Sequence, residues 1–208
     1  SNLVLDTGSF AFIDPRDLIV DYNSTTTNPL GTLYVTDYAS RAIIRIEIGH
    51  PTSAAPINTG SYQFDSPSGI AIDSMRGYLY AIDWGNHQIV RIPLSAPSET
   101  SIVNHGSDQF DSLIALTIDV EANILYLLNS QSRIYAMQLP NPIEIHEIER
   151  ANSDIIPSWR GLQWEPTAMR LYTINYATQA LEFIQFESNG IPHPDLQIVK
   201  LPFSPTSG

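Results

Sequence analysis

The chain has 208 residues, with 22 acidic and 10 basic side chains, a formal net charge of −12 at pH 7, and no cysteine. The missing cysteine excludes a disulfide scaffold, a thiolate zinc site and a cysteine nucleophile. The negative charge opposes binding to nucleic acid or to an anionic membrane surface. No apolar run approaches the roughly 18 residues of a spanning helix, so we expect no membrane insertion.

A repeat of 46 residues organises the chain. The motif Leu-Tyr-x-x-Asp/Asn occurs four times at this spacing, at residues 33–37, 79–83, 125–129 and 171–175. A second motif, Gly-Ser-x-Gln-Phe-Asp-Ser, occupies residues 60–66 and 106–112, and a related copy at residues 8–14 begins 52 residues before the first of these. The six extra residues indicate an insertion in the first repeat at residues 23–28.

Each repeat predicts four short strands. Apolar runs that end in an acid predict the first strand at residues 18–21, 70–73, 116–119 and 162–165, and the Leu-Tyr motif predicts the second. Third strands are expected at residues 42–48, 88–94, 133–139 and 180–186, and weaker fourth strands at residues 55–58, 101–104, 143–148 and 196–201. The runs are short, β-branched and aromatic, and bounded by turn residues. Four strands in such a period are typical of a β-propeller blade.

The predicted fold is all-β: one domain over residues 1–208, a β-propeller of four four-stranded blades with an extra N-terminal strand. The repeats span approximately residues 8–59, 60–105, 106–151 and 152–208. The extra strand consists of Leu3, Val4, Leu5, Asp6 and Thr7. It has three interpretations: it pairs with the last blade of its own chain, it pairs with a blade edge of another copy, or the chain is part of a longer propeller. Head-to-tail pairing between copies would form rings or filaments.

The second repeat carries a family resemblance. Pro-Ser-Gly-Ile-Ala-Ile-Asp at residues 67–73, followed by residues 77–89, resembles an NHL repeat and is similar to the YWTD repeat of lipoprotein-receptor propellers. The resemblance weakens in the third and fourth repeats, where Asn129 and Asn175 replace the aspartate. It implies a propeller, usually six-bladed, and a structural role for the aspartate position, but it specifies no activity.

Four repeat-equivalent acids are the candidate catalytic or metal-binding residues. Their side chains end the first strand of each blade, so they could surround one end of the axial channel and hold Ca²⁺. They are Asp21, Asp73, Asp119 and Glu165. Alternatively, each acid binds backbone amides of its own turn, which we favour because the feature recurs in every blade. Resembling propeller hydrolases and lyases use converging metal ligands, but no such set is evident here, so we expect no cofactor and no enzyme.

Two further residues are candidates for binding or modification. Trp84 follows the repeated strand at a turn and is a candidate ligand-stacking aromatic. Asn23-Ser24-Thr25 is an N-glycosylation sequon within the insertion. Four tyrosines share one repeat position, Tyr34, Tyr80, Tyr126 and Tyr172, and are expected to pack between blades.

The sequence therefore predicts a non-enzymatic extracellular or cell-surface glycoprotein that acts as a protein-interaction or structural module. The expected partners are other copies of the chain, head to tail, in a fibril that forms through N-terminal strand exchange. The first alternative is a metal-dependent hydrolase or lyase that uses the channel acids. The second is a carbohydrate-binding propeller, with glycans as ligands.

Overall fold

The computed structural model describes residues 7–8, 10–23, 30–103, 112–140, 145–148 and 158–187. The chain divides into two compact units, Ser1–Asn104 and His105–Gly208, here called the first and second unit. Each unit holds two antiparallel sheets, and each sheet is formed by consecutive strands of one repeat. Among the described residues the only helical segment is one 3₁₀ turn, η1 (Pro97–Glu99), and no helix there is long and apolar enough to cross a membrane.

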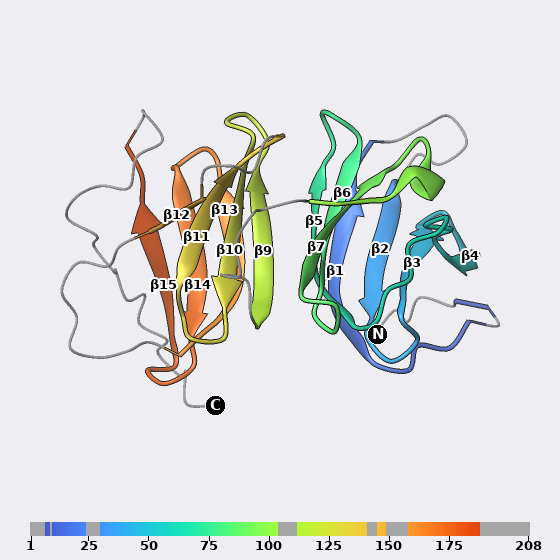
Figure 1. Cartoon of the computed structure of the whole chain (residues 1–208), viewed down its shortest axis with the longest axis horizontal. Helices are drawn as coiled ribbons and strands as arrows, with labels where there is room; N and C mark the ends of the chain where they lie inside the picture. The colour runs from blue at the N-terminus through green and yellow to red at the C-terminus, as the bar shows by residue number, and fades with distance from the viewer. Residues whose placement is uncertain are drawn as a thin grey trace, which may run out of the picture. The chain divides into compact units, whose positions relative to one another are not determined.

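The first unit contains two four-stranded sheets, each with its strands in sequence order (Figure 1). The strands of its first sheet are β1 (Pro15–Asp21), β2 (Thr32–Asp37), β3 (Ala42–Glu47) and β4 (His50–Pro56). Those of its second sheet are β5 (Pro67–Asp73), β6 (Tyr78–Asp83), β7 (Gln88–Pro93) and β8 (Ser101–Ile102).

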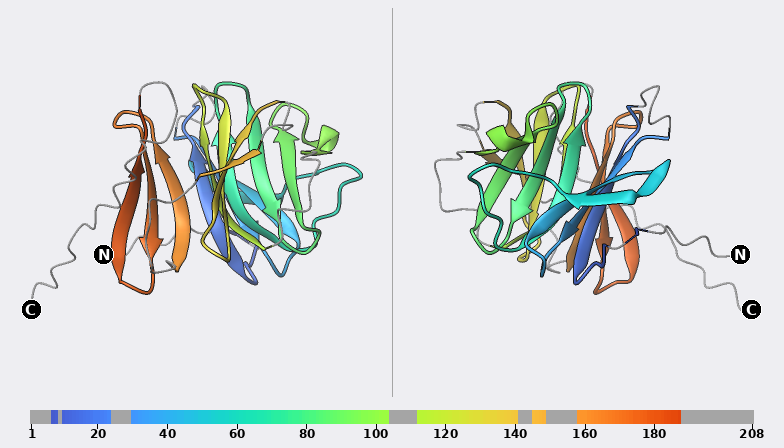
Figure 2. Two further views of the ribbon diagram at one scale, coloured as in Figure 1. Left: turned by 60° about the vertical axis from the view of Figure 1, so that its left-hand side comes forward. Right: turned by 90° about the vertical axis from the view of Figure 1, so that its right-hand side faces the viewer.

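The second unit repeats this meander (Figure 2). Its first sheet contains β9 (Leu113–Asp119), β10 (Ile124–Asn129), β11 (Ile134–Gln138) and β12 (Ile145–Glu147). The described part of its second sheet has three strands, β13 (Trp159–Glu165), β14 (Arg170–Asn175) and β15 (Ala180–Gln185).

The 46-residue repeat also specifies backbone details. The register between the first two strands shifts near the start of the first strand in every sheet, for example between Pro15 and Asp17 in β1. The turns after β2 and β6 place Arg41 and His87 at φ values of 57° and 54°. A left-handed residue at the same turn position in successive repeats shows that the repeat encodes turn geometry as well as strand position.

Sheet faces within each unit pack against each other to form the core. In the first unit, Tyr34 of β2 lies in one apolar cluster with Ile70 of β5 and Leu79 of β6. In the second unit, the rings of Tyr126 and Trp164 lie 5.2 Å apart, centroid to centroid, in the corresponding cluster. The second strands β2, β6 and β10 are buried on both faces, which explains why they are nearly continuous apolar runs rather than alternating ones.

The prediction of an all-β propeller with four blades is confirmed. The third strands lie within one residue of the expected bounds, whereas β1, β5, β9 and β13 begin three residues earlier than the apolar runs indicate. The expected strand at residues 196–201 and residues 1–6 of the N-terminal strand lie outside the described residues. Thr7 is described, and it is not in a strand; its hydroxyl donates a hydrogen bond to the carbonyl of Phe10 at 2.7 Å.

Candidate functional site

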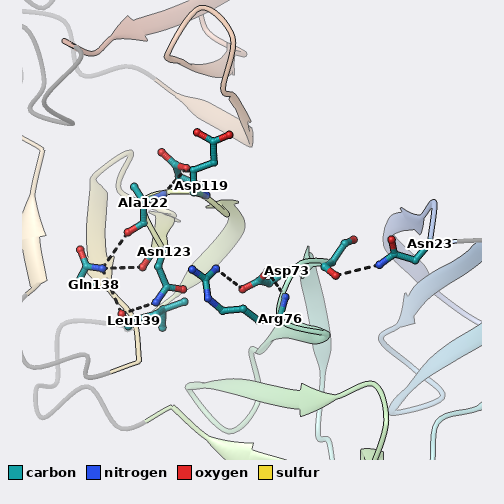
Figure 3. Close-up of polar contacts among 10 residues, drawn as sticks. Asn23, Asp73, Arg76, Asp119, Ala122, Asn123, Gln138 and Leu139 are labelled. Carbon is teal, nitrogen blue, oxygen red and sulfur yellow. Dashed lines mark hydrogen bonds and ion pairs between the residues drawn. The ribbon is translucent and has the colours of Figure 1, made fainter.

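The candidate channel acids of the first unit cap the turns that follow their strands. The carboxylate of Asp21 accepts hydrogen bonds from the amide of Asn23 at 3.0 Å and from the hydroxyl of Ser74 at 3.2 Å. Asp73 accepts from the amide and the guanidinium of Arg76 at 2.9 and 3.0 Å (Figure 3). Both carboxylates are therefore engaged by groups of the chain itself.

The corresponding acids of the second unit do the same. Asp119 accepts from the amide of Ala122 at 3.0 Å (Figure 3), and Glu165 from the amide of Ala168 at 2.7 Å. The Ala168 hydrogen bond lowers the pKa of Glu165. Within the described segments, no group of three or more His, Asp or Glu side chains could hold a metal ion. The calcium hypothesis stays a prediction that metal analysis can test.

Two other acids, one at the end of each second strand of the first unit, brace the chain entering each blade. Asp83 is fully buried and accepts from the amide of Ser66 at 2.9 Å, the hydroxyl of Tyr62 at 2.7 Å and the side-chain amide of Asn86 at 2.8 Å. Its Oδ atoms also lie 3.2 Å from the amide nitrogen of Asp65. Burial and the nearby Asp83 carboxylate together raise the pKa of Tyr62.

Asp37 is the equivalent residue in the first blade, and it is also fully buried. It accepts from the amides of Ile13 and Asp14, both at 2.8 Å, and from the amide of Ser40 at 3.4 Å. Burial alone would raise the pKa of Asp37, but these amide hydrogen bonds outweigh burial and lower the pKa. The carboxylate is thus charged at neutral pH with only neutral donors around it.

The residue after each of these buried aspartates is aromatic. The rings of Tyr38 and Trp84 lie 6.3 Å apart, centroid to centroid, at 46°. The His87 ring lies 6.4 Å beyond Trp84, and the Arg16 guanidinium lies 4.7 Å from the centroid of the Tyr38 ring. We call Arg16, Tyr38, Trp84 and His87 the aromatic row. Trp84 is 41% exposed, so the row presents an indole to solvent on the first unit.

Two ion pairs flank the aromatic row. Arg16 pairs with Asp14 at 2.6 Å, and Arg41 pairs with Asp65 at 3.1 Å. The Asp65 carboxylate packs directly against Gly85, where any side chain would collide with it. Glycine at position 85 therefore lets an acid lie beside the backbone of the Trp84 turn.

The row belongs to the first unit alone among the described repeats. The equivalent positions in the second unit are Ser130 and Tyr176, and Tyr176 is 75% exposed with no aromatic neighbour at position 130. Sequence reasoning selected Trp84 but missed Tyr38 and Arg16. The repeat itself carried the signal for Tyr38, because this residue lies 46 positions before Trp84.

The sequon asparagine lies on an exposed turn. The side-chain nitrogen of Asn23 donates to the carbonyl of Ser74 at 3.0 Å (Figure 3). Ser24 and Thr25 lie outside the described residues, and glycosylation of Asn23 stays a prediction.

A buried acid in the second unit breaks the repeat pattern. Glu182 is 2% exposed and accepts from Trp159 Nε1 at 2.8 Å and from Asn175 Nδ2 at 2.9 Å. The aligned residues in the first unit are Ile44 and Val90. Asn175 replaces the aspartate of the first two repeats, and its side-chain amide donates the hydrogen bond that the neighbouring Glu182 carboxylate accepts. This pairing explains the Asp-to-Asn change in the fourth repeat.

Comparisons with known proteins define the fold. No family model matches the chain, and no curated protein matches it. Among solved structures, a chain of the nidogen–laminin complex is 16% identical, with 74% of this chain and 56% of that chain covered and a TM-score of 0.60. Virginiamycin B lyase from Staphylococcus aureus, solved as an inactive variant with quinupristin, is 14% identical, with 92% and 56% covered and a TM-score of 0.58.

A second lyase structure, of a streptogramin B lyase, is 13% identical, with 91% of this chain and 55% of that chain covered and a TM-score of 0.59. The chain spans about half the length of these neighbours. The fold is a β-propeller, which is consistent with the NHL/YWTD resemblance of the repeats. Because these neighbours include a chain from a protein complex and two lyases, the fold alone does not define an activity.

Proposed function

We propose that this chain is a non-enzymatic protein-interaction module and that the aromatic row is its docking surface. The observation that carries the proposal is the exposed indole of Trp84 beside Tyr38 and Arg16. Tryptophan, tyrosine and arginine are the residues most enriched at binding hot spots. The nidogen–laminin neighbour shows that the fold occurs in a protein complex, which supports the same proposal.

The aromatic row is rigidly supported. Tyr38 and Trp84 each follow a fully buried aspartate whose hydrogen bonds hold the turn. A side chain whose backbone is already fixed loses little entropy on binding, so affinity is gained through preorganisation. The row therefore suits a stable contact better than an aromatic on an unbraced loop would.

Site-specific photo-crosslinking tests this proposal. A benzoylphenylalanine replaces Ala39, next to Tyr38, and in a matched control it replaces the repeat-equivalent Ala177, next to Tyr176. We expect a saturable crosslink to a partner protein from Ala39, absent when Trp84→Ala is added. Equal crosslinking from both positions, or no dependence on Trp84, would contradict the proposal.

We infer self-assembly as a second property, with residues 3–7 of one copy pairing along a blade edge of the next. Among the described residues, β4 (His50–Pro56) is the outer-edge strand of the first sheet, and the unpaired backbone groups of a sheet edge are a template for an added strand. Deletion of residues 1–7 should convert assemblies to single chains by light scattering. An unchanged mass would exclude strand exchange.

An extracellular, glycosylated protein is the third part of the proposal. It is supported by the exposed position of Asn23 and by the sequon that begins there. Secretion from eukaryotic cells should add a glycan that peptide N-glycosidase F removes and that Asn23→Gln abolishes. A secreted wild-type chain with no mass change on glycosidase treatment would contradict it.

Two alternative functions remain testable. The exposure of Trp84 favours a carbohydrate ligand, and glycan-array binding that Trp84→Ala abolishes would establish it. The lyase neighbours favour an enzyme, and one equivalent of tightly bound Ca²⁺ or Zn²⁺ in the purified protein would support that function. We expect no such metal, because the four channel acids bind groups of their own turns or, for Asp21, also a neighbouring turn.

A further inference from the structure

We propose that the partner of the aromatic row is a basic peptide segment, one of whose lysine or arginine side chains lies over the indole of Trp84. This inference rests on the proposed function, since it assigns the chemistry of the partner that binds the row.

The charges around the row favour a cation. Two arginines, Arg16 and Arg41, lie at this end of the first unit and are already paired. Four aspartates lie at the same end, Asp14, Asp37, Asp65 and Asp83. Among the described residues, the hydrogen bonds to the two buried aspartates come from amides, a hydroxyl and a side-chain amide, and no lysine or arginine there pairs with them. Tyr38 and Trp84 directly follow these two aspartates in the chain, so the negative charge lies close to the row and attracts a positive side chain.

Cation–π contacts between arginine and an aromatic ring already occur within the chain, and one of them is in the row. Arg16 lies over Tyr38 at 4.7 Å, and in the second unit Arg170 lies over Phe183 at 4.4 Å. Tryptophan is the strongest cation–π acceptor, yet no lysine or arginine among the described residues lies over Trp84. Among the described residues, therefore, the Trp84 indole has no cation over its ring and can accept one from a partner.

Ring geometry disfavours a glycan as the partner of the row, and net charge disfavours a second copy of the chain. Ring planes inclined at 46° and 47° do not form the flat platform on which successive sugar rings stack. A second copy of this chain carries the same net charge of −12, so electrostatic steering opposes its approach to a negative surface. A segment rich in lysine or arginine satisfies both the charge and the ring geometry.

The test uses a fluorescein-labelled heptapeptide of alternating glycine and lysine and the same peptide with every lysine acetylated. Fluorescence anisotropy measures the Kd of each for the intact chain. We expect the acetylated peptide to bind at least about tenfold more weakly, since acetylation removes the charge. Trp84→Ala should weaken binding of the lysine peptide about tenfold, whereas Tyr176→Ala, an equivalent exposed aromatic, should leave it unchanged.

A charge variant gives an effect of opposite sign. Arg41→Ala removes a competing cation from Asp65 and should tighten binding about threefold. Melting temperatures confirm that each variant folds. Equal binding of the acetylated peptide, or equal losses for Trp84→Ala and Tyr176→Ala, would overturn the inference. If the Ala39 crosslink still captures a partner in a Trp84-dependent way, the docking function stands and only the partner's chemistry is wrong.

Discussion

Substitution of Asp83 by alanine should be one of the most destabilising single changes to the first unit. The carboxylate is fully buried and accepts four hydrogen bonds, from the amides of Asp65 and Ser66 and from the side chains of Tyr62 and Asn86. Alanine removes this acceptor from all four donors, although the Tyr62 hydroxyl and the Asn86 side chain keep second acceptors in Gln88 Oε1 and the Gln63 carbonyl. Water can reach the partly exposed Tyr62 and Asn86 side chains, so the lasting cost comes from the two amides.

The magnitude follows from these two amide hydrogen bonds. A hydrogen bond to a charged group contributes roughly 1.5–3 kcal/mol net, and losses that share one acceptor do not add fully. We therefore expect Asp83→Ala to lower the free energy of unfolding by about 3–5 kcal/mol. Asp83→Asn keeps one oxygen acceptor and should cost about half as much.

Urea denaturation followed by circular dichroism measures both variants, with Glu99→Ala as an exposed-acid control. The control should change the free energy of unfolding by less than about 0.5 kcal/mol. A loss below about 1 kcal/mol for Asp83→Ala, with an unchanged urea dependence, would refute the bracing role of this residue.

Three further outcomes follow from single groups. Burial raises the pKa of Asp17, so its charged form lowers the free energy of unfolding at neutral pH. This destabilisation disappears as the pH falls through the raised pKa. Asp17→Asn should therefore stabilise the chain at pH 7 and progressively less toward pH 4 in urea titrations. Asn175→Asp places a second carboxylate against Glu182 and should show a coupling of about 2 kcal/mol with Glu182→Gln in a double-mutant cycle; additive losses would refute the pairing. Gly85→Ala collides with the Asp65 carboxylate and should cost about 1–2 kcal/mol. Asp65→Ala should relieve this loss only in part in calorimetry, because the Cβ at position 65 would still lie 2.8 Å from the new Cβ.

The fold was predictable because the same strand and turn motifs recur in all four repeats. Apolar runs at period 46 located the strands, and the shared Leu-Tyr motif aligned the blades. Bounds were wrong where the chain enters a blade, since residues such as Pro15 and Pro67 join the first strand through a register shift that no propensity encodes. Hydrogen bonding rather than hydrophobicity defines those ends.

The candidate site was only partly predictable. Trp84 was identified from its turn, but the contact with Tyr38 depends on how two adjacent blades pack, which a repeat alignment cannot give. Glu182 was missed because the equivalent strand positions are apolar, and a buried carboxylate there is stabilised by donors that come from distant positions such as Trp159. Side chains that depend on tertiary contacts leave little trace in a local pattern.

Hydrogen–deuterium exchange of the chain, free and bound to the lysine heptapeptide, tests the central claim most directly. We expect slower exchange in residues 13–17, 37–41 and 83–88, which carry the aromatic row together with Asp14 and Arg41 of the flanking ion pairs. The equivalent turn of the fourth blade, residues 175–180, should be unaffected. Protection confined to that turn or to the outer strands, with no change around Tyr38 and Trp84, would contradict the assignment of the docking surface.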